Sequence, residues 1–252
     1  MSKKLLMGVL IAGLLLAGCA GKGGSSTGTN STSGGSSSAD LSGALNLVLG
    51  SSDSPSVFDS YHIELSLDIP QLNDDSTAVV NNKTLISADV AGSDVHIIQT
   101  DPGATESKEG FIIGDKEYKI IDGTPQEMMG QIALSWAMWP LQVVMPYAYA
   151  ANFAQKTGTD TIDGRAADVY TFDAANADAA SKSMMESFGL NGMTNGKGTV
   201  WIDQATGAML KLDMTYDETL SDSDQKEIGT GTGNITIEIS KVGQVTITSP
   251  VQ

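Results

Sequence analysis

The chain is poor in cysteine, histidine and basic residues, and each shortage excludes a class of function. Cys19 is the single cysteine among 252 residues, so no disulfide framework can form. The two histidines, His62 and His96, lie far apart without a His-x-x-x-His spacing, so we expect no transition-metal site. Lys and Arg number 14 against 30 Asp and Glu, and the formal net charge is −16. This balance argues against binding to nucleic acid and against docking on anionic membranes through a basic patch.

The sequence also lacks the local motifs of common catalytic and ion-binding sites. It contains no Gly-x-Ser-x-Gly elbow, and Lys197 is followed by Gly198 where a phosphate-binding loop requires Ser or Thr. Asp222-Ser-Asp224 begins like a calcium loop, but Glu227 occupies the position of the required Gly. We therefore expect no enzyme, no cofactor and no metal. A hydrolase would need a nucleophile and a base that nothing in the sequence singles out.

The N-terminus has the pattern of an export signal. Lys3 and Lys4 precede an apolar run, which ends in Leu16-Ala-Gly-Cys19. This ending resembles the bacterial lipobox. The resemblance implies that residues 1–18 are a lipoprotein signal peptide, removed before Cys19, and that the Cys19 sulfur carries a diacylglycerol. A third acyl chain usually follows on the new amino group, and two or more chains anchor a protein stably on a membrane.

Residues 19–40 are predicted to be the lipidated cysteine and a flexible linker. The segment from Ala20 to Asp40 consists mostly of Gly, Ser and Thr, a composition typical of a coil with a reach of roughly 25 Å. The composition changes at about Leu41, and residues 41–252 fit a single domain. Leu45, Leu47 and Leu49 predict a short helix at its beginning.

Most of this domain has a strand-like sequence. Residues 61–69 alternate strictly between apolar and polar side chains, which is typical of a half-buried strand. Asp163-Gly164 is a strong hairpin signal. Residues 177–188 predict a second helix and residues 217–227 an acidic exposed connection. Strands are predicted over residues 61–69, 83–91, 94–100, 110–113, 116–121, 159–162, 166–172, 198–202, 208–216 and, with a bulge at Val242-Gly243, 235–247.

The segment from Thr124 to Ala154 interrupts these strands with an apolar, helix-forming insert. Thr124-Pro-Gln-Glu127 combines an N-cap, a proline at the first helical position and a capping-box glutamate. The residues that follow are apolar almost all round a helix, a pattern typical of a helix buried on several sides. Two interpretations remain open: a core helix, or one wall of an apolar cavity. We assign the fold class as α+β, a curved antiparallel sheet with helices covering one face.

Four stretches together carry a resemblance to a known group: residues 110–119, 162–172, 198–203 with Thr206-Gly207, and 239–247. In this order they resemble bacterial lipoproteins of the LolA/LppX-like superfamily. The resemblance implies an unclosed half-barrel wrapped around helices, with a hydrophobic cavity between them that binds lipids or lipoprotein acyl chains. The insert would line that cavity with Met128, Ile132, Trp136, Met138, Trp139 and Met145. Cys19 indicates the anchored branch of the superfamily instead of a free shuttle.

Two functions follow as hypotheses. In the first, the chain is a monomeric lipoprotein, anchored on the extracytoplasmic side of a membrane, that binds or transfers a lipid or another apolar ligand. In the second, it is an envelope structural or sensory domain with a packed interior and a protein partner. The volume of the cavity separates the two, because a ligand pocket needs some hundreds of Å³ open to the surface.

Overall fold

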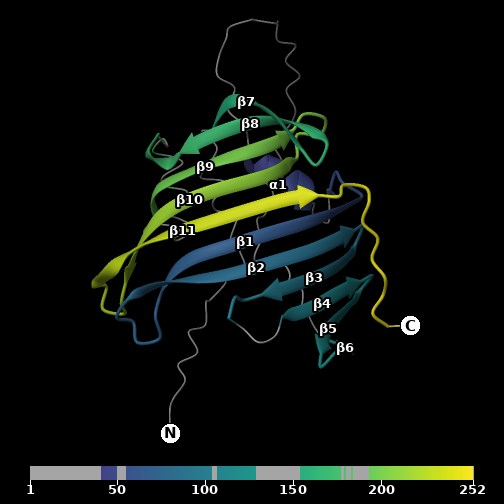
Figure 1. Ribbon diagram of the computed structural model, residues 1–252, viewed down its shortest axis with the longest axis horizontal. Coiled ribbons are helices and arrows are strands. Elements are labelled where there is room, and N and C mark those ends of the chain that lie inside the picture. Colours follow the sequence, from purple (N-terminus) through teal and green to yellow (C-terminus); the bar gives the residue numbers. More distant parts are fainter. Residues whose placement is uncertain are drawn as a thin grey trace, which may run out of the picture. The chain divides into compact units, whose positions relative to one another are not determined.

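The computed structural model describes residues 41–49, 55–103, 107–128, 154–176, 179, 183 and 193–251. The chain divides into two units, Met1–Gly35 and Ser36–Gln252, and the described residues all belong to the second. Their strands form one sheet of eleven in the order β6-β5-β4-β3-β2-β1-β11-β10-β9-β8-β7 (Figure 1). Strands β6 and β7 are its opposite edges, so the sheet is not closed into a barrel. The expected unclosed antiparallel sheet is confirmed.

Each strand pairs antiparallel with its neighbours, as short hairpin connections favour. Helix α1 (Leu41–Leu49) precedes the sheet and confirms the predicted short helix, and the 3-10 turn η1 (Ala174–Asn176) follows β8. The strands are β1 (Ser60–Leu72), β2 (Val79–Ala91), β3 (Asp94–Thr100), β4 (Lys108–Ile113), β5 (Lys116–Ile121), β6 (Thr124–Glu127), β7 (Gln155–Ile162), β8 (Arg165–Asp173), β9 (Met193–Asp203), β10 (Met209–Ser221) and β11 (Glu227–Ser240).

Alternation along the strands gives the sheet two unlike faces. In β1 the large buried side chains from residue 61 to 67 are those of Tyr61, Ile63, Leu65 and Leu67. The residues between them, His62, Glu64 and Ser66, point to the opposite side because successive side chains of a strand alternate. We call the first side the apolar face and the second the polar face. Helix α1 lies behind the sheet in the view of Figure 1 and contributes buried side chains to the same core as the apolar face.

The predicted Asp163-Gly164 hairpin is confirmed by its backbone. Asp163 has a φ of 47° and Gly164 a φ of 77°, as a two-residue turn of type I′ requires. The turn joins β7 to β8, with Ile162 opposite Arg165. Asp122 and Gly123 form a second such turn, with φ values of 51° and 72°, between β5 and β6.

The predicted helix start at Thr124 is wrong. Residues Thr124–Glu127 form strand β6, which pairs with β5 at the edge of the sheet. Pro125 is tolerated there because an edge strand leaves half of its N–H groups without a ladder partner. The ladder continues one residue further, where the Met128 N–H donates to the Glu117 carbonyl at 2.8 Å. The remainder of the predicted insert, from residue 129 to 153, lies outside the described residues.

Two predictions near the C-terminus are also corrected. Residues 217–227 are not an extended acidic connection, because β10 continues to Ser221 and the Asp222 carboxylate closes a short turn by accepting from the Asp224 and Lys226 N–H groups. The final strand ends at Ser240, and residues 245–250 are not in a strand. Positive φ values at Lys241 and Gly243 turn the chain away. Of the predicted second helix, the described residues Ala179 and Ser183 are helical.

Candidate ligand-binding faces of the sheet

The centre of the apolar face is a continuous row of aliphatic side chains that crosses five strands. Val200 lies opposite Leu212, Leu212 opposite Ile237, Ile237 opposite Leu65, and Leu65 opposite Ile86. All five side chains are buried. Each contributes roughly 1.5–3 kcal/mol by leaving water, so this row is the centre of the core.

Helix α1 covers part of this face. Its Ala44, Leu45 and Val48 are buried in the same cluster as the strands, and its Leu47 carbonyl accepts a 2.8 Å hydrogen bond from the Val57 N–H. Leu47 also approaches the β9–β10 turn, where its Cδ1 lies 3.7 Å from the place of a Cβ on Gly207. The helix is therefore held against the sheet by packing and by one backbone bond.

A partly buried ion pair fixes the turn on which α1 rests. Asp203 is 2% exposed, and its Oδ2 accepts from Arg165 Nη2 at 2.7 Å and from the Thr206 hydroxyl at 2.6 Å. The Thr206 N–H donates to the same oxygen at 3.1 Å. The Arg165 guanidinium lies 5.1 Å from the centroid of the Phe58 ring, which adds a cation–π contact. We call this arrangement the Asp203 latch; it joins β8, the β9–β10 turn and the segment after α1.

Aromatic rings fill the spaces beside two glycines on the apolar face. The Phe172 ring lies directly over Gly198 and the Tyr216 ring over Gly233, so closely that a Cβ at either glycine would overlap the ring. Both aromatic side chains are buried. The glycines are thus part of the packing, because they let a ring cross the neighbouring strand.

Polar groups on the apolar face are few, and burial changes their titration. Burial raises the pKa of Tyr61 to about 12, so its hydroxyl stays protonated at neutral pH. Glu218 follows Tyr216 on the same side of β10, opposite Gly231, and burial raises the pKa of its carboxyl above the ordinary value. The chemistry of this face is therefore burial of apolar groups, with a carboxyl group towards one end.

The structure describes only one of the residues that the sequence assigns to a cavity. Met128 follows β6 and is half-buried. Cys19 and the other five cavity candidates, Ile132, Trp136, Met138, Trp139 and Met145, lie outside the described residues, so the cavity wall and the lipidation site stay predictions. Within the described part of the chain, no three His, Cys, Asp or Glu side chains are placed to hold a metal ion. No helix among the described residues is long and apolar enough to cross a membrane.

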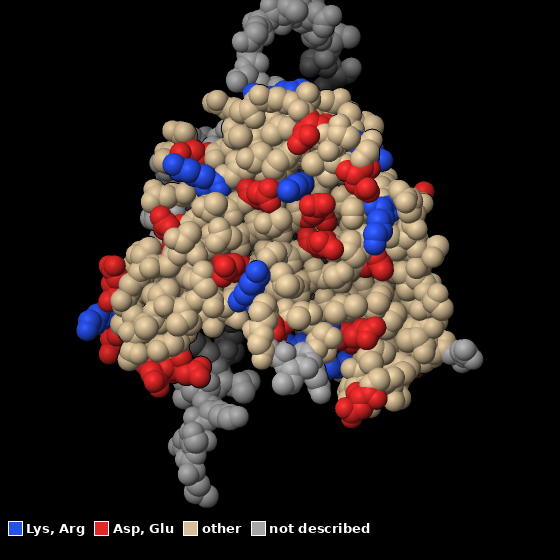
Figure 2. All heavy atoms as spheres, viewed as in Figure 1, with Lys and Arg blue, Asp and Glu red and all other residues tan. Residues whose placement is uncertain are grey.

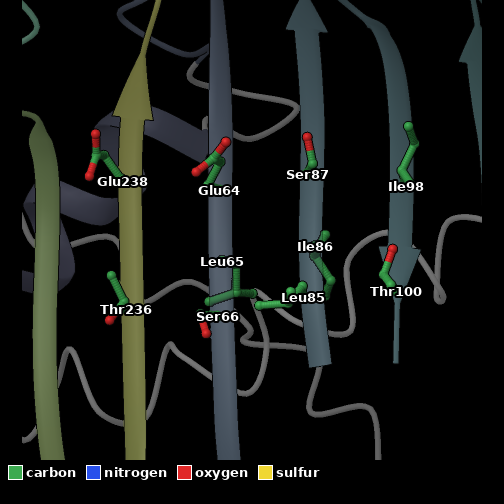
Figure 3. Close-up of a pocket in the computed structure, with 10 residues that line it drawn as sticks. All are labelled: Glu64, Leu65, Ser66, Leu85, Ile86, Ser87, Ile98, Thr100, Thr236 and Glu238. Carbon is green, nitrogen blue, oxygen red and sulfur yellow. The ribbon is translucent and has the colours of Figure 1, made fainter. Parts of the chain in front are cut away.

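Sequence reasoning missed a hollow on the polar face. A pocket of about 310 Å³ opens over β11, β1, β2 and β3, and Glu64, Ser66, Leu85, Ser87, Thr236 and Glu238 are among its lining residues (Figure 3). The alternation of β1 already placed Glu64 and Ser66 on this side. Nothing in the sequence shows which residues of distant strands stand beside them.

Comparisons with known proteins give likenesses of fold. No protein-family model and no curated protein sequence matches this chain. Among solved structures, it is similar to the lipoprotein LppX of Mycobacterium tuberculosis, with 16% identity over 83% of this chain and 98% of that one and a TM-score of 0.43. LprF of Mycobacterium bovis shares 18% identity over 86% of this chain and 100% of its own, also with a TM-score of 0.43. A LolA superfamily protein of Nitrosomonas europaea shares 11% identity over 82% and 93%, with a TM-score of 0.27.

Proposed function

We propose that this chain is a membrane-anchored extracytoplasmic lipoprotein that binds or transfers a lipid or another apolar ligand at the apolar face of its half-barrel. The observation that carries the proposal is the position of the two strands beside the insert. Strand β6 ends at Glu127 on one edge of the sheet, and β7 begins at Gln155 on the other. The chain between them, rich in Met and Trp, therefore joins the two edges of a sheet that has one apolar face.

Burial alone gives such a site useful affinity. Each methylene group that leaves water contributes roughly 0.8 kcal/mol, so an acyl chain gains enough without any charged contact. Methionine suits the lining of such a site because its unbranched thioether adapts to irregular ligands. Met128, Met138 and Met145, with Ile132, Trp136 and Trp139, are the lining residues that we propose. We propose binding and not catalysis, because this chemistry needs neither a nucleophile nor a base.

A second function is favoured by a specific observation, the dense packing of the described core. Leu45, Val48, Leu210, Ile235 and Ile239 have 0% exposure, as in an interior filled by its own side chains. A half-barrel packed throughout in this way would be an envelope structural or sensory domain whose partner is a protein.

These two functions can be distinguished by extracting lipid from the full chain after it has been purified from its own host. Denaturation followed by extraction into organic solvent and mass spectrometry is expected to release a lipid in near-equimolar amount, in addition to the acyl chains bound covalently. A fusion of residues 1–40 to a protein without a lipid site, purified in the same way, controls for lipid carried over from the membrane. An extract that contains no lipid beyond this background contradicts the binding function and favours the packed domain.

Cys19→Ser is expected to abolish membrane anchoring completely. The serine hydroxyl does not replace the thiol as the acceptor of the diacylglycerol, and no second cysteine exists. The measurement is metabolic labelling with an alkyne analogue of palmitate, followed by separation of membrane and soluble fractions. The unchanged chain is expected to be labelled, and the serine variant is expected to carry no label. A labelled serine variant would show that the lipobox interpretation is wrong.

A further inference from the structure

The polar face carries a row of hydroxyl side chains that crosses the sheet at right angles to its strands. The register places Thr171 beside Thr199, Thr236 beside Ser66, and Thr100 at the far end on β3. Asp213 on β10 and Leu85 on β2 complete the row at the two intervening strands. Seven strands at about 4.8 Å spacing give this row a length of roughly 29 Å.

Two hollows lie along this row and share one lining residue. The pocket of about 310 Å³ covers the end near Thr100, and a second of about 490 Å³ covers the end near Thr171. Thr236 lines both. Figure 3 shows Thr236, Ser66, Leu85 and Thr100 in line along one side of the first pocket, with Glu238, Glu64, Ser87 and Ile98 along the other. We call the two hollows together the trough.

The hydroxyl groups of the trough are available to a ligand. Within the part of the chain that the structure describes, the hydroxyls of Thr171, Thr199, Thr236, Ser66 and Thr100 make no hydrogen bond. Each can both donate and accept. Leu85, with 39% exposure, adds an apolar surface among them.

The charged side chains at the trough are mainly acidic, because the carboxylates of Glu64, Asp213 and Glu238 line it and Lys211 is shared between the last two. Lys211 Nζ lies 3.3 Å from Asp213 Oδ2 and 4.0 Å from Glu238 Oε2. Lys197 Nζ lies 3.4 Å from Asp173 Oδ2. Figure 2 shows this face of the sheet, with acidic and basic side chains dispersed over a mainly uncharged surface. A polyanion would be repelled by these carboxylates, whereas uncharged hydroxyl groups can donate hydrogen bonds to them.

We propose that the trough binds an extended, uncharged polyhydroxy chain, that is, a neutral glycan. Such a chain presents alternating hydroxyl donors and acceptors, which match the free hydroxyls, and apolar C–H faces, which match Leu85. Two hollows along one row of hydroxyl groups suit a polymer better than a compact ligand. The proposal concerns the polar face and is independent of the ligand of the apolar face.

The test is calorimetric titration of the full chain with neutral hexasaccharides: maltohexaose, cellohexaose, laminarihexaose and chitohexaose. At least one is expected to bind, with affinity that rises from the disaccharide to the hexasaccharide as more of the row is covered. Thr236→Trp enlarges the residue that lines both hollows and is expected to abolish binding. Thr236→Val keeps the shape and is expected to weaken binding about 3- to 10-fold, as the loss of one hydrogen bond implies. Thr161→Val, an exposed strand threonine on β7 outside the trough, is the matched control and should bind as the unchanged chain does.

Urea unfolding of each variant shows that the sheet is intact. The proposal is overturned if none of the four hexasaccharides binds, or if Thr236→Trp binds as tightly as the unchanged chain. It is equally overturned if sedimentation shows a dimer that Thr236→Trp dissociates, because the face would then be an interface between two copies.

Discussion

Asp203→Ala is expected to lower the free energy of unfolding by about 3 kcal/mol, within the range for removal of one partner from a buried ion pair. The carboxylate is 2% exposed and receives three hydrogen bonds, two from Thr206 and one from Arg165. Arg165 Nε is buried and makes no hydrogen bond of its own within the described structure, so the variant leaves a partly buried cation without its anion. Urea unfolding at pH 7 measures the change. The side chain of Arg165 is 28% exposed, which is why we expect the lower end of the range.

The Asp203 latch also predicts a dependence on pH. Burial alone would raise the pKa of the Asp203 carboxyl, but the hydrogen bonds from Arg165 and Thr206 outweigh it and hold the pKa below its ordinary value. A lowered pKa in the folded state stabilises the fold above the unfolded pKa of about 3.9, and this stability is lost as the pH falls through the folded value.

Asp203→Asn separates this contribution from that of other carboxylates. The asparagine variant is expected to be less stable than the unchanged chain at pH 7, with a difference that shrinks between about pH 5 and pH 3. Asp74→Asn, in an exposed turn after β1, is the control and should leave the stability unchanged. The contrary result is that the free energies of unfolding of the Asp203→Asn variant and the unchanged chain differ by the same amount over this range. That result would show that the latch does not depend on the ionised carboxylate.

The alternation of apolar and polar residues predicted most of the strands, because it can be read within one segment without knowing the neighbouring strands. The apolar side chains of residues 61–69 share one side whatever their neighbours are, so β1 was found from its sequence alone. The same argument found only the second half of β11 and missed the first half, where Gly229, Gly231 and Gly233 stand on one side of the strand. Glycine carries no side chain that could show the alternation, and the rings and side chains that fill these gaps come from other strands.

The helix predicted at Thr124 shows a tertiary contact overriding local signals. Threonine, proline and glutamate each fit the first turn of a helix, and together they contribute at most a few kcal/mol. In the structure these residues extend a hairpin that begins at the Asp122-Gly123 turn, and Pro125 lies opposite Ile120. The turn signal one residue earlier was the better guide, because a type I′ turn favours a second strand after it.

The trough could not be predicted, because it depends on register between segments distant in the sequence. Alternation assigns Ser66 and Thr236 to one face each, but only the pairing of β1 with β11 places the two side by side. The same holds for the Asp203 latch, in which Arg165 reaches an aspartate 38 residues away. Pairings of this kind depend on the whole sheet. A single sequence therefore predicts which face a residue lies on, but not which residues of other strands lie beside it.

Gly198→Ala is expected to lower the free energy of unfolding by about 1–3 kcal/mol or more, as overpacking of a core does. A Cβ at this position would overlap the Phe172 ring and lie 2.7 Å from the Asp213 carbonyl oxygen. The ring is buried and the carbonyl belongs to β10, so relief requires a side chain and a neighbouring strand to move together. Urea unfolding of the full chain measures the cost.

Gly158→Ala is the matched control, since Gly158 is also a strand glycine but a Cβ there would meet nothing within 4 Å. It is expected to be neutral or to stabilise by about 0.4–1 kcal/mol, because alanine reduces the freedom of the unfolded chain. If both variants proved equally stable, the Phe172 ring and β10 would have room to move, and the apolar face would not be packed throughout. That result would favour space for a ligand behind the sheet, whereas a large cost at Gly198 alone shows that this part of the face is filled by the protein itself.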